Sequence, residues 1–187
     1  KLTVVMTVMA QKKNNMKKKN LIITCIFFIF FFITMFLSLD KNKIYSTRDF
    51  VGQQLADVDL EYFNKNSIFN TKKISNYNFT LINFWASWCG PCRKEHKNLM
   101  ALSENKNLKI IGINFRDKQN NAKEFLKEMG NPFFILTKDT DGKKSVNFGV
   151  YGIPETILVN QDLQILKKYI GPLSLKDVRE INKIVKK

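Results

Sequence analysis

A chain of 187 residues with an apolar share of 44% has room for one domain of ordinary size with its own core, and for an extension. Its formal net charge of +15 is unevenly spread: residues 1–20 carry six lysines and no acid, and the remainder carries 25 basic and 16 acidic side chains. The later lysines alternate with acids, as on a solvated surface, and the sequence has no nucleic-acid-binding motif, so a nucleic-acid partner is excluded.

The run Leu21–Leu39 contains 19 residues without a charge and predicts a transmembrane helix. Lysines precede it and Asp40 follows it, so the positive-inside rule places residues 1–20 in the cytoplasm and the following chain outside. The alternative is a cleaved signal peptide. The run is longer than the usual apolar region of roughly 7 to 15 residues and no small-residue cleavage site follows, so we expect a single-pass anchor. Met16, followed by three lysines, is typical of a natural start, and we expect residues 1–15 not to be native.

Residues 40–49 are polar and predict a short tether between the membrane and a folded domain over residues 50–187. At the start of this domain, residues 50–78 carry short, alternating apolar runs separated by Asn, Lys and Ser. This pattern predicts a β-hairpin or small strands rather than a helix.

Two strand and helix pairs follow. The apolar run Thr80–Trp85 predicts a buried strand, and residues 89–104 predict a helix after it. Leu108–Phe115 predicts the next strand, and Asn121–Met129 carries apolar residues at helical spacing, with Gly130 placed to end that helix. Strands alternating with helices imply a parallel sheet with crossover connections.

The last part of the chain predicts an antiparallel pair and a closing helix. A short apolar run at Phe133–Leu136 precedes a turn at 139–143. The runs Thr156–Val159 and Leu163–Ile170 flank a polar turn, as in a hairpin, and a Ser-x-x-Asp pair at 174–177 predicts the start of a helix. The whole pattern predicts an α/β fold with a central mixed sheet flanked by helices.

Two cysteines three residues apart, Cys89 and Cys92, stand at the first strand-to-helix turn. The first N–H groups of a helix have no intrahelical partner and its dipole is positive at that end, so the pKa of Cys89 is expected to fall. Pro91 fits the first turn, where a missing N–H costs nothing. Cys92 can form a disulfide with Cys89 and resolve a mixed disulfide, so the pair predicts thiol–disulfide exchange.

Half of a zinc ribbon has the same cysteine spacing, but zinc needs a second pair of ligands. The chain offers only Cys25, inside the apolar run, and His96, for which we expect a helix-surface or capping role. A c-type haem site needs His directly after the second cysteine, where this chain has Arg93. We therefore expect no bound metal or haem.

Several sequence blocks follow one another over residues 84–156. They are Phe84-Trp85-Ala86-Ser87-Trp88-Cys89-Gly90-Pro91-Cys92, Cys92-Arg93-Lys94-Glu95-His96, Gly112-Ile113-Asn114-Phe115-Arg116-Asp117, Gly130-Asn131-Pro132-Phe133 and Gly149-Val150-Tyr151-Gly152-Ile153-Pro154-Glu155-Thr156. By these blocks the chain, from about residue 50 to the C-terminus, resembles the thioredoxin superfamily and, within it, the DsbE/CcmG family of membrane-anchored thiol:disulfide interchange proteins of cytochrome c maturation. Gly90-Pro91 is the dipeptide of general thioredoxins, so the specific family rests mainly on the last block.

The resemblance implies roles for the residues around the Cys89–Cys92 disulfide. Pro154 would be cis and lie against the disulfide, Ile153 would present its backbone to an extended substrate segment, and Glu155 would come close to the cysteines. The alternative for Pro154 is an ordinary trans turn before a strand.

Asn83 stands where thioredoxins, by resemblance, have a buried acid below the disulfide. Glu155 and Glu95 are then the candidates to accept the proton of Cys92. A nearby carboxylate also disfavours the thiolate, which would make the protein a better reductant. Trp88 is the aromatic residue expected to touch the substrate.

By resemblance, the protein is a reductase in the bacterial inner membrane with its domain in the periplasm. Its substrate would be a disulfide of apocytochrome c or of a cytochrome c maturation partner, and a DsbD/CcdA-type membrane carrier would supply the electrons. The cysteine pair needs no further cofactor. Alternatives are a general envelope thioredoxin-like reductase and a non-catalytic apocytochrome docking module. A copper chaperone on this fold would resemble C-x-x-x-C with a distant His, and the chain has neither.

Overall fold

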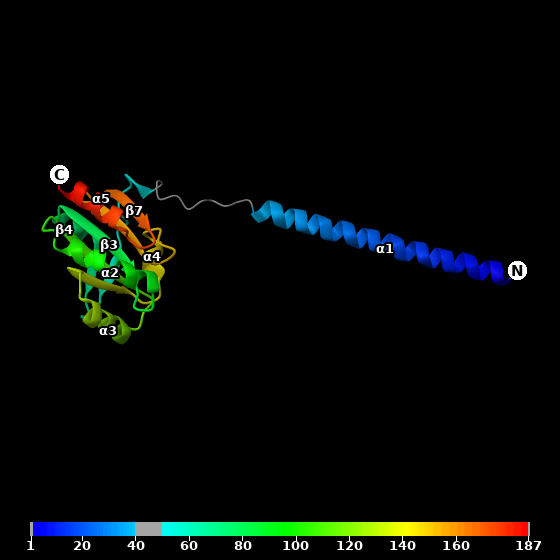
Figure 1. Ribbon diagram of the computed structural model, residues 1–187, viewed down its shortest axis with the longest axis horizontal. Coiled ribbons are helices and arrows are strands. Elements are labelled where there is room, and N and C mark those ends of the chain that lie inside the picture. Colours follow the sequence, from blue (N-terminus) through cyan, green and yellow to red (C-terminus); the bar gives the residue numbers. More distant parts are fainter. Residues whose placement is uncertain (1, 40–49, 187) are drawn as a thin grey trace. The chain divides into compact units, whose positions relative to one another are not determined.

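The computed structural model describes residues 2–39 and 50–186, with side chains in the first range for residues 18–36 (Figure 1). The chain divides into two units, Lys1–Ser46 and Thr47–Lys187. The predicted tether at 40–49 lies outside the described residues.

The first unit contains one long helix, α1 (Leu2–Leu39). Within it, Lys18–Phe36 has a mean hydropathy of 2.1 over 19 residues, and none of this segment is buried against protein. Its length and composition make it a candidate membrane span, although a signal sequence would have the same properties.

The second unit is built on one seven-stranded sheet with the order β2-β1-β5-β4-β3-β6-β7. Its strands are β1 (Asp59–Tyr62), β2 (Ile68–Asn70), β3 (Phe79–Trp85), β4 (Leu108–Phe115), β5 (Ile135–Asp139), β6 (Glu155–Asn160) and β7 (Ile165–Ile170). The central strands β3, β4 and β5 are parallel, and the other neighbours are antiparallel. The helical elements are η2 (Thr71–Asn76, a 3-10 helix), α2 (Gly90–Ser103), α3 (Gln119–Met129), α4 (Lys143–Val146) and α5 (Leu175–Val185). The predicted fold class, a mixed sheet flanked by helices, is confirmed.

Alternate side chains of β3 enter two cores on opposite faces of the sheet. Leu81 and Trp85 belong to the core that α2, α3 and α5 complete, which we call the helical-face core. Ile82 and Phe84 belong to the core on the other face, with residues of the β1–β2 hairpin and of the loop before β6. Because strand side chains alternate, Asn83 lies on the same face as α2.

Most predicted elements lie within two residues of their expected bounds. The bounds of β4 are those predicted, and a capping box between Ser174 and Asp177 opens α5. The strand β5 begins at Ile135 rather than at Phe133, because the Phe133 ring turns into the helical-face core and stacks on Trp85. The single turn of α4 was not predicted, since the sequence there indicates only a turn.

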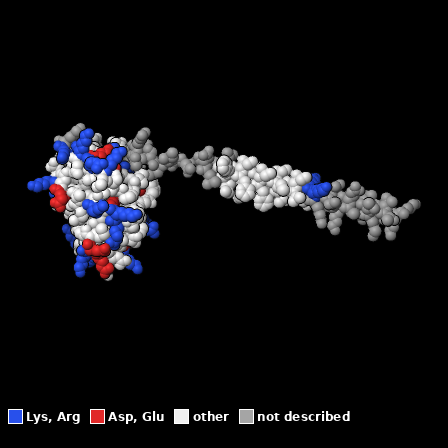
Figure 2. Space-filling model, in the orientation of Figure 1, with Lys and Arg blue, Asp and Glu red and all other residues white. Residues whose placement is uncertain are grey.

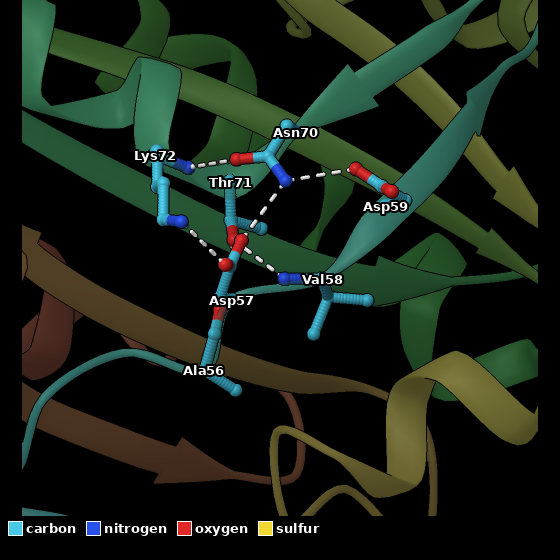
Figure 3. Close-up of polar contacts among 7 residues, drawn as sticks. All are labelled: Ala56, Asp57, Val58, Asp59, Asn70, Thr71 and Lys72. Carbon is cyan, nitrogen blue, oxygen red and sulfur yellow. Dashed lines mark hydrogen bonds and ion pairs between the residues drawn. The ribbon is translucent and has the colours of Figure 1, made fainter.

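A polar network joins the residues around the hairpin to η2 (Figure 3). Asn70, the N-cap of η2, donates hydrogen bonds to Asp57 (2.9 Å) and Asp59 (2.8 Å). The hydroxyl of Thr71 bonds the backbone on both sides of Asp57, and Lys72 pairs with Asp57 at 2.7 Å. The hairpin itself was predicted, whereas η2 was not, because Asn and Ser favour hairpin turns as well as helix caps.

The charged side chains of the second unit are distributed as expected for a solvated surface. On the face seen in Figure 2, lysines and arginines are interspersed with acids and no continuous basic stripe covers that face.

Candidate active site

Cys89 and Cys92 form a disulfide at the start of α2, with their Cα atoms 5.3 Å apart. Cys89 is the N-cap residue, and its sulfur accepts a hydrogen bond from the backbone N–H of Cys92 at 3.1 Å. Pro91 lies in the first turn. Both cysteines belong to the helical-face core. The donor that faces the sulfur in the disulfide would equally stabilise a Cys89 thiolate after reduction, which is the condition for nucleophilic attack.

The loop that leads into the disulfide is held by the segment after β4. Asp117 accepts hydrogen bonds from the backbone N–H of Ser87 (2.6 Å) and from the Ser87 hydroxyl (2.8 Å). The indole N–H of Trp88 donates to the carbonyl of Arg116 at 3.1 Å, and Arg116 has a left-handed backbone with φ of 46°. Trp88 is nevertheless 60% exposed. Its ring is therefore fixed at one edge and available to a partner beside Cys89.

Below the disulfide, Asn83 and Glu95 form a buried polar pair. The Asn83 side-chain amide donates to Glu95 Oε1 (2.9 Å) and to the Thr156 hydroxyl (3.0 Å), and the backbone N–H of Leu173 donates to Glu95 Oε2 (2.7 Å). Burial raises the pKa of Glu95 to about 7, against the opposing effect of the Leu173 and Asn83 hydrogen bonds. Glu95 follows Cys92 by one helical turn, so the two share a face of α2.

The Ile153–Pro154 peptide bond is cis, as expected from the resemblance. Phe84 and Glu155 are partners in the antiparallel pair of β3 and β6. Pro154, the residue before Glu155, therefore lies opposite Trp85, the residue after Phe84, where the cysteine loop begins. Ile153 is partly buried and packs against both cores, including the one that contains the cysteines.

Glu155 lies on the other face of the sheet from the Asn83–Glu95 pair. Its strand partner Phe84 points to the core opposite α2, so the Glu155 carboxylate is on the face of the sheet opposite Asn83 and Glu95. There it pairs with Lys168 at 3.1 Å and accepts hydrogen bonds from two backbone N–H groups of the preceding loop. The next residue, Thr156, has the side chain that reaches Asn83.

His96 is buried rather than on the helix surface. Its Nε2 lies 3.0 Å from the carbonyl oxygen of Gly130, at the end of α3, and its ring packs edge-on against Phe125. Burial lowers the pKa of His96, which favours the neutral ring with the proton on Nε2. The residue therefore joins α2 to α3, and the predicted capping role describes it better than the predicted surface role.

Three further residues of the site, Asp117, Thr156 and Lys168, were not predicted from the sequence. Asp117 and Thr156 end two of the sequence blocks that carry the resemblance, which was the only signal for them. Lys168 has no such signal, because two adjacent lysines, Lys167 and Lys168, give no indication of which one points into the protein. Among the described residues, no three His, Cys, Asp or Glu side chains are placed to hold a metal ion.

Comparisons with known proteins agree with this geometry. The Redoxin family model matches residues 50–185. The thiol:disulfide interchange protein CycY of Rhizobium leguminosarum bv. viciae is 48% identical over 101 residues, which are 52% of this chain and 54% of CycY. HelX of Rhodobacter capsulatus, another thiol:disulfide interchange protein, is 38% identical over 66% of this chain and 69% of its own length. Further relatives are named DsbE, so the predicted family is confirmed.

Solved structures with the same fold are also found. A secreted thiol-disulfide isomerase from Corynebacterium glutamicum covers 72% of this chain and 87% of its own, with a TM-score of 0.62 and 22% identity. At that identity the likeness shows the fold alone. The chain spans little more than half the length of CycY.

Proposed function

The chain belongs to the Redoxin family and, within it, to the thiol:disulfide interchange proteins of the DsbE kind, and from this premise we propose that it reduces protein disulfides during cytochrome c biogenesis. The observation that carries the proposal is the Cys89–Cys92 pair, which stands at a helix N-terminus with a backbone donor aimed at the Cys89 sulfur. Only a thiolate is a competent nucleophile, and the helix N-terminus and this backbone donor both favour the thiolate form of Cys89.

In the proposed reaction the protein starts as the dithiol. The Cys89 thiolate attacks one sulfur of a substrate disulfide, and the other substrate sulfur leaves as a thiolate. Cys92 then loses its proton and attacks the Cys89 sulfur, which releases the second substrate thiol and leaves Cys89 and Cys92 as a disulfide. Two electrons have moved from the protein to the substrate, and no metal or organic cofactor takes part.

Glu95 is the proposed acceptor of the Cys92 proton. An acceptor works best when its pKa is near the operating pH, and burial raises the pKa of Glu95 to about 7. Asn83 orients the carboxylate through its hydrogen bond to Oε1. Glu155, the other candidate, has its carboxylate on the opposite face and is bonded to Lys168, so it is the weaker one.

The proposed substrate is the disulfide of an apocytochrome c haem-binding motif, or of the maturation protein that holds it. An extended segment of this partner would lie along the Ile153 backbone beside Pro154, with Trp88 on the side of Cys89. Regeneration of the dithiol in an oxidising compartment requires a dedicated supply of electrons, for which we propose a DsbD/CcdA-type membrane carrier.

The proposed location is the bacterial inner membrane. In this arrangement residues 1–20 are cytoplasmic, residues 21–39 form a single-pass anchor, and the tether 40–49 leads to a periplasmic domain at 50–187. The apolar surface of Lys18–Phe36 and the lysines before it support this topology.

The test is to trap the substrate in cells with a Cys92→Ala variant, which can form a mixed disulfide through Cys89 but cannot resolve it. The variant is made with Cys25→Ser, because Cys25 is a free, exposed cysteine of α1 that could form disulfides of its own. The matched control carries Cys89→Ala in the same background. We expect apocytochrome c or its maturation partners, and the membrane electron carrier, to be linked to Cys89 and absent from the control.

Two other results would reject the proposal in different ways. Capture of many unrelated envelope proteins would identify a general thioredoxin-like reductase, the function to which the Gly90-Pro91 dipeptide is also suited. Cytochrome assembly that continues in a Cys89→Ser strain, with no protein captured, would identify a docking module that exchanges no electrons.

A further inference from the structure

Lys168, on β7, has a wholly buried side chain that ends among acceptors of one loop. Its ammonium group donates to the carbonyl oxygens of Phe148 (3.2 Å) and Gly149 (2.6 Å), and pairs with the Glu155 carboxylate at 3.1 Å. Phe148 and Gly149 lie near the start of the loop between α4 and β6, and Glu155 follows directly after this loop. One side chain therefore holds both ends of this loop.

Glu155 extends the same restraint to the middle of the loop. Its Oε1 accepts hydrogen bonds from the backbone N–H groups of Tyr151 (3.2 Å) and Gly152 (3.3 Å). The next two residues are Ile153 and Pro154, against which the substrate segment is proposed to lie. The ion pair thus supports the docking segment from the face of the sheet opposite the cysteines.

A buried ammonium is a costly way to fill this space. Burial lowers the pKa of Lys168, and the charge of Glu155 acts in the opposite direction. An apolar side chain of similar length would pack without that cost, but it would leave two buried carbonyl groups and a carboxylate without the ammonium. The lysine favours one loop conformation. Its ammonium group can bind the two carbonyl oxygens and the Glu155 carboxylate together only when the loop brings these three acceptors to the same place.

We infer that Lys168 is a positioning residue for substrate docking, whose ion pair with Glu155 shapes the 148–154 loop so that it binds a polypeptide disulfide. The inference rests on the proposed function, because it concerns how that substrate is held. It assigns Glu155 to loop support and leaves proton transfer to Glu95. Lys168 touches neither cysteine in any described contact, so its loss should weaken docking without slowing the sulfur chemistry.

The experiment compares two substrates of different size in single-turnover reactions of the pre-reduced full chain. One is an oxidised peptide with a Cys-x-x-Cys-His sequence, and the other is the small aromatic disulfide 5,5′-dithiobis(2-nitrobenzoate). For Lys168→Met we expect the half-saturating peptide concentration to rise about tenfold or more, with the maximal rate and the rate with the small disulfide within twofold of wild type. Lys167→Met is the matched control, since this neighbouring lysine is half-exposed and pairs with Glu180 instead.

Amide hydrogen exchange at Tyr151 and Gly152 provides a readout that needs no substrate. We expect about tenfold faster exchange at both in Lys168→Met and no change in Lys167→Met. If Lys168→Met does not fold, Glu155→Gln replaces it, because it removes the ionic partner and keeps an acceptor, and a smaller change in the same direction is expected. Unchanged exchange with unchanged peptide affinity would overturn the inference, as would equal losses with both disulfides. A wild-type protein that reduces the small disulfide but not the peptide would instead overturn the proposed substrate, and exchange would still decide the role of Lys168.

Discussion

At the scale of single residues, neighbours on one strand act on different faces. Thr156 reaches the Asn83–Glu95 pair near the cysteines, whereas Glu155 pairs with Lys168 on the other face. The separation follows from the two-residue period of a strand. Of the two glutamates, only Glu95 thus lies on the face of the sheet that carries the disulfide, and its protonation can be tested directly.

The Glu95→Gln variant should alter how stability depends on pH. The pKa of Glu95 is raised from 4.5 to about 7 by burial, so between these values the unfolded chain releases this proton while the folded chain keeps it. The contribution of Glu95 is fully present below pH 4.5 and is lost as the pH rises to about 7, by about 3 kcal/mol in the free energy of unfolding. In the glutamine variant this slope should be absent, as measured by urea unfolding of the oxidised protein across that range.

The control for this prediction is Glu124→Gln on the exposed side of α3, which should keep the slope of the wild type. The absolute stability of Glu95→Gln can differ at every pH, because its amide would face the Leu173 N–H. The slope is therefore the quantity to compare. A slope equal to that of the wild type would mean that Glu95 does not hold its proton near neutral pH, and the pKa match on which its role as acceptor of the Cys92 proton rests would be absent.

At the scale of elements, the loop between β4 and α3 determines the path of the cysteine loop. The Asp117 carboxylate accepts hydrogen bonds from Ser87, Asn114 and Lys118. The Arg116 carbonyl accepts one from the indole N–H of Trp88. This explains why an acidic residue ends the block that begins at Gly112. The carboxylate works as a support for the residues before Cys89 and touches neither sulfur in any described contact.

Asp117→Asn is expected to destabilise the protein by about 1–3 kcal/mol, because the amide nitrogen would replace one of the two carboxylate oxygens, each of which accepts two hydrogen bonds. The loop that it supports precedes Cys89, so the rate of thiol exchange should fall as well. Urea unfolding and single-turnover reduction of a small disulfide measure the two effects. Asp162→Asn, in the exposed turn between β6 and β7, is the control and should change neither. A variant with wild-type stability would show that the Asp117 bonds do not support the loop.

The sequence predicted the elements better than it predicted their mutual contacts. Local apolar patterns predicted β3, β4 and the helices α2, α3 and α5, because each depends on residues close together in the sequence. Gly112 is a different case: a Cβ there would lie 2.7 Å from the ring of Phe133, which stacks on Trp85. Likewise, the buried Lys168 ammonium donates to carbonyl groups that lie about twenty residues earlier in the chain. Such contacts between distant segments leave no periodic pattern, so the resemblance marked some of these residues without giving the physical cause.

At the scale of the whole molecule, charge and hydrophobicity are divided along the chain. The first 20 residues carry lysines and no acids, Lys18–Phe36 exposes an apolar surface, and the folded unit carries both signs of charge. A reductase can act on envelope proteins only if its cysteines are on the outer side of the membrane. The proposed topology is thus a condition for the proposed function, and it depends on the N-terminal lysines rather than on the folded unit.

A single reporter cysteine tests this topology. In a chain with Cys25, Cys89 and Cys92 changed to Ser, Gln161→Cys places one thiol in the exposed turn between β6 and β7. A membrane-impermeant maleimide should label it as fully in intact spheroplasts as after lysis. Replacing the lysines of residues 12–19 with asparagine and adding lysines within 40–49 should reduce labelling before lysis, because the charge bias across the apolar segment is reversed. Labelling of the original chain only after lysis would place the domain in the cytoplasm, where it could not reduce apocytochrome c in the periplasm.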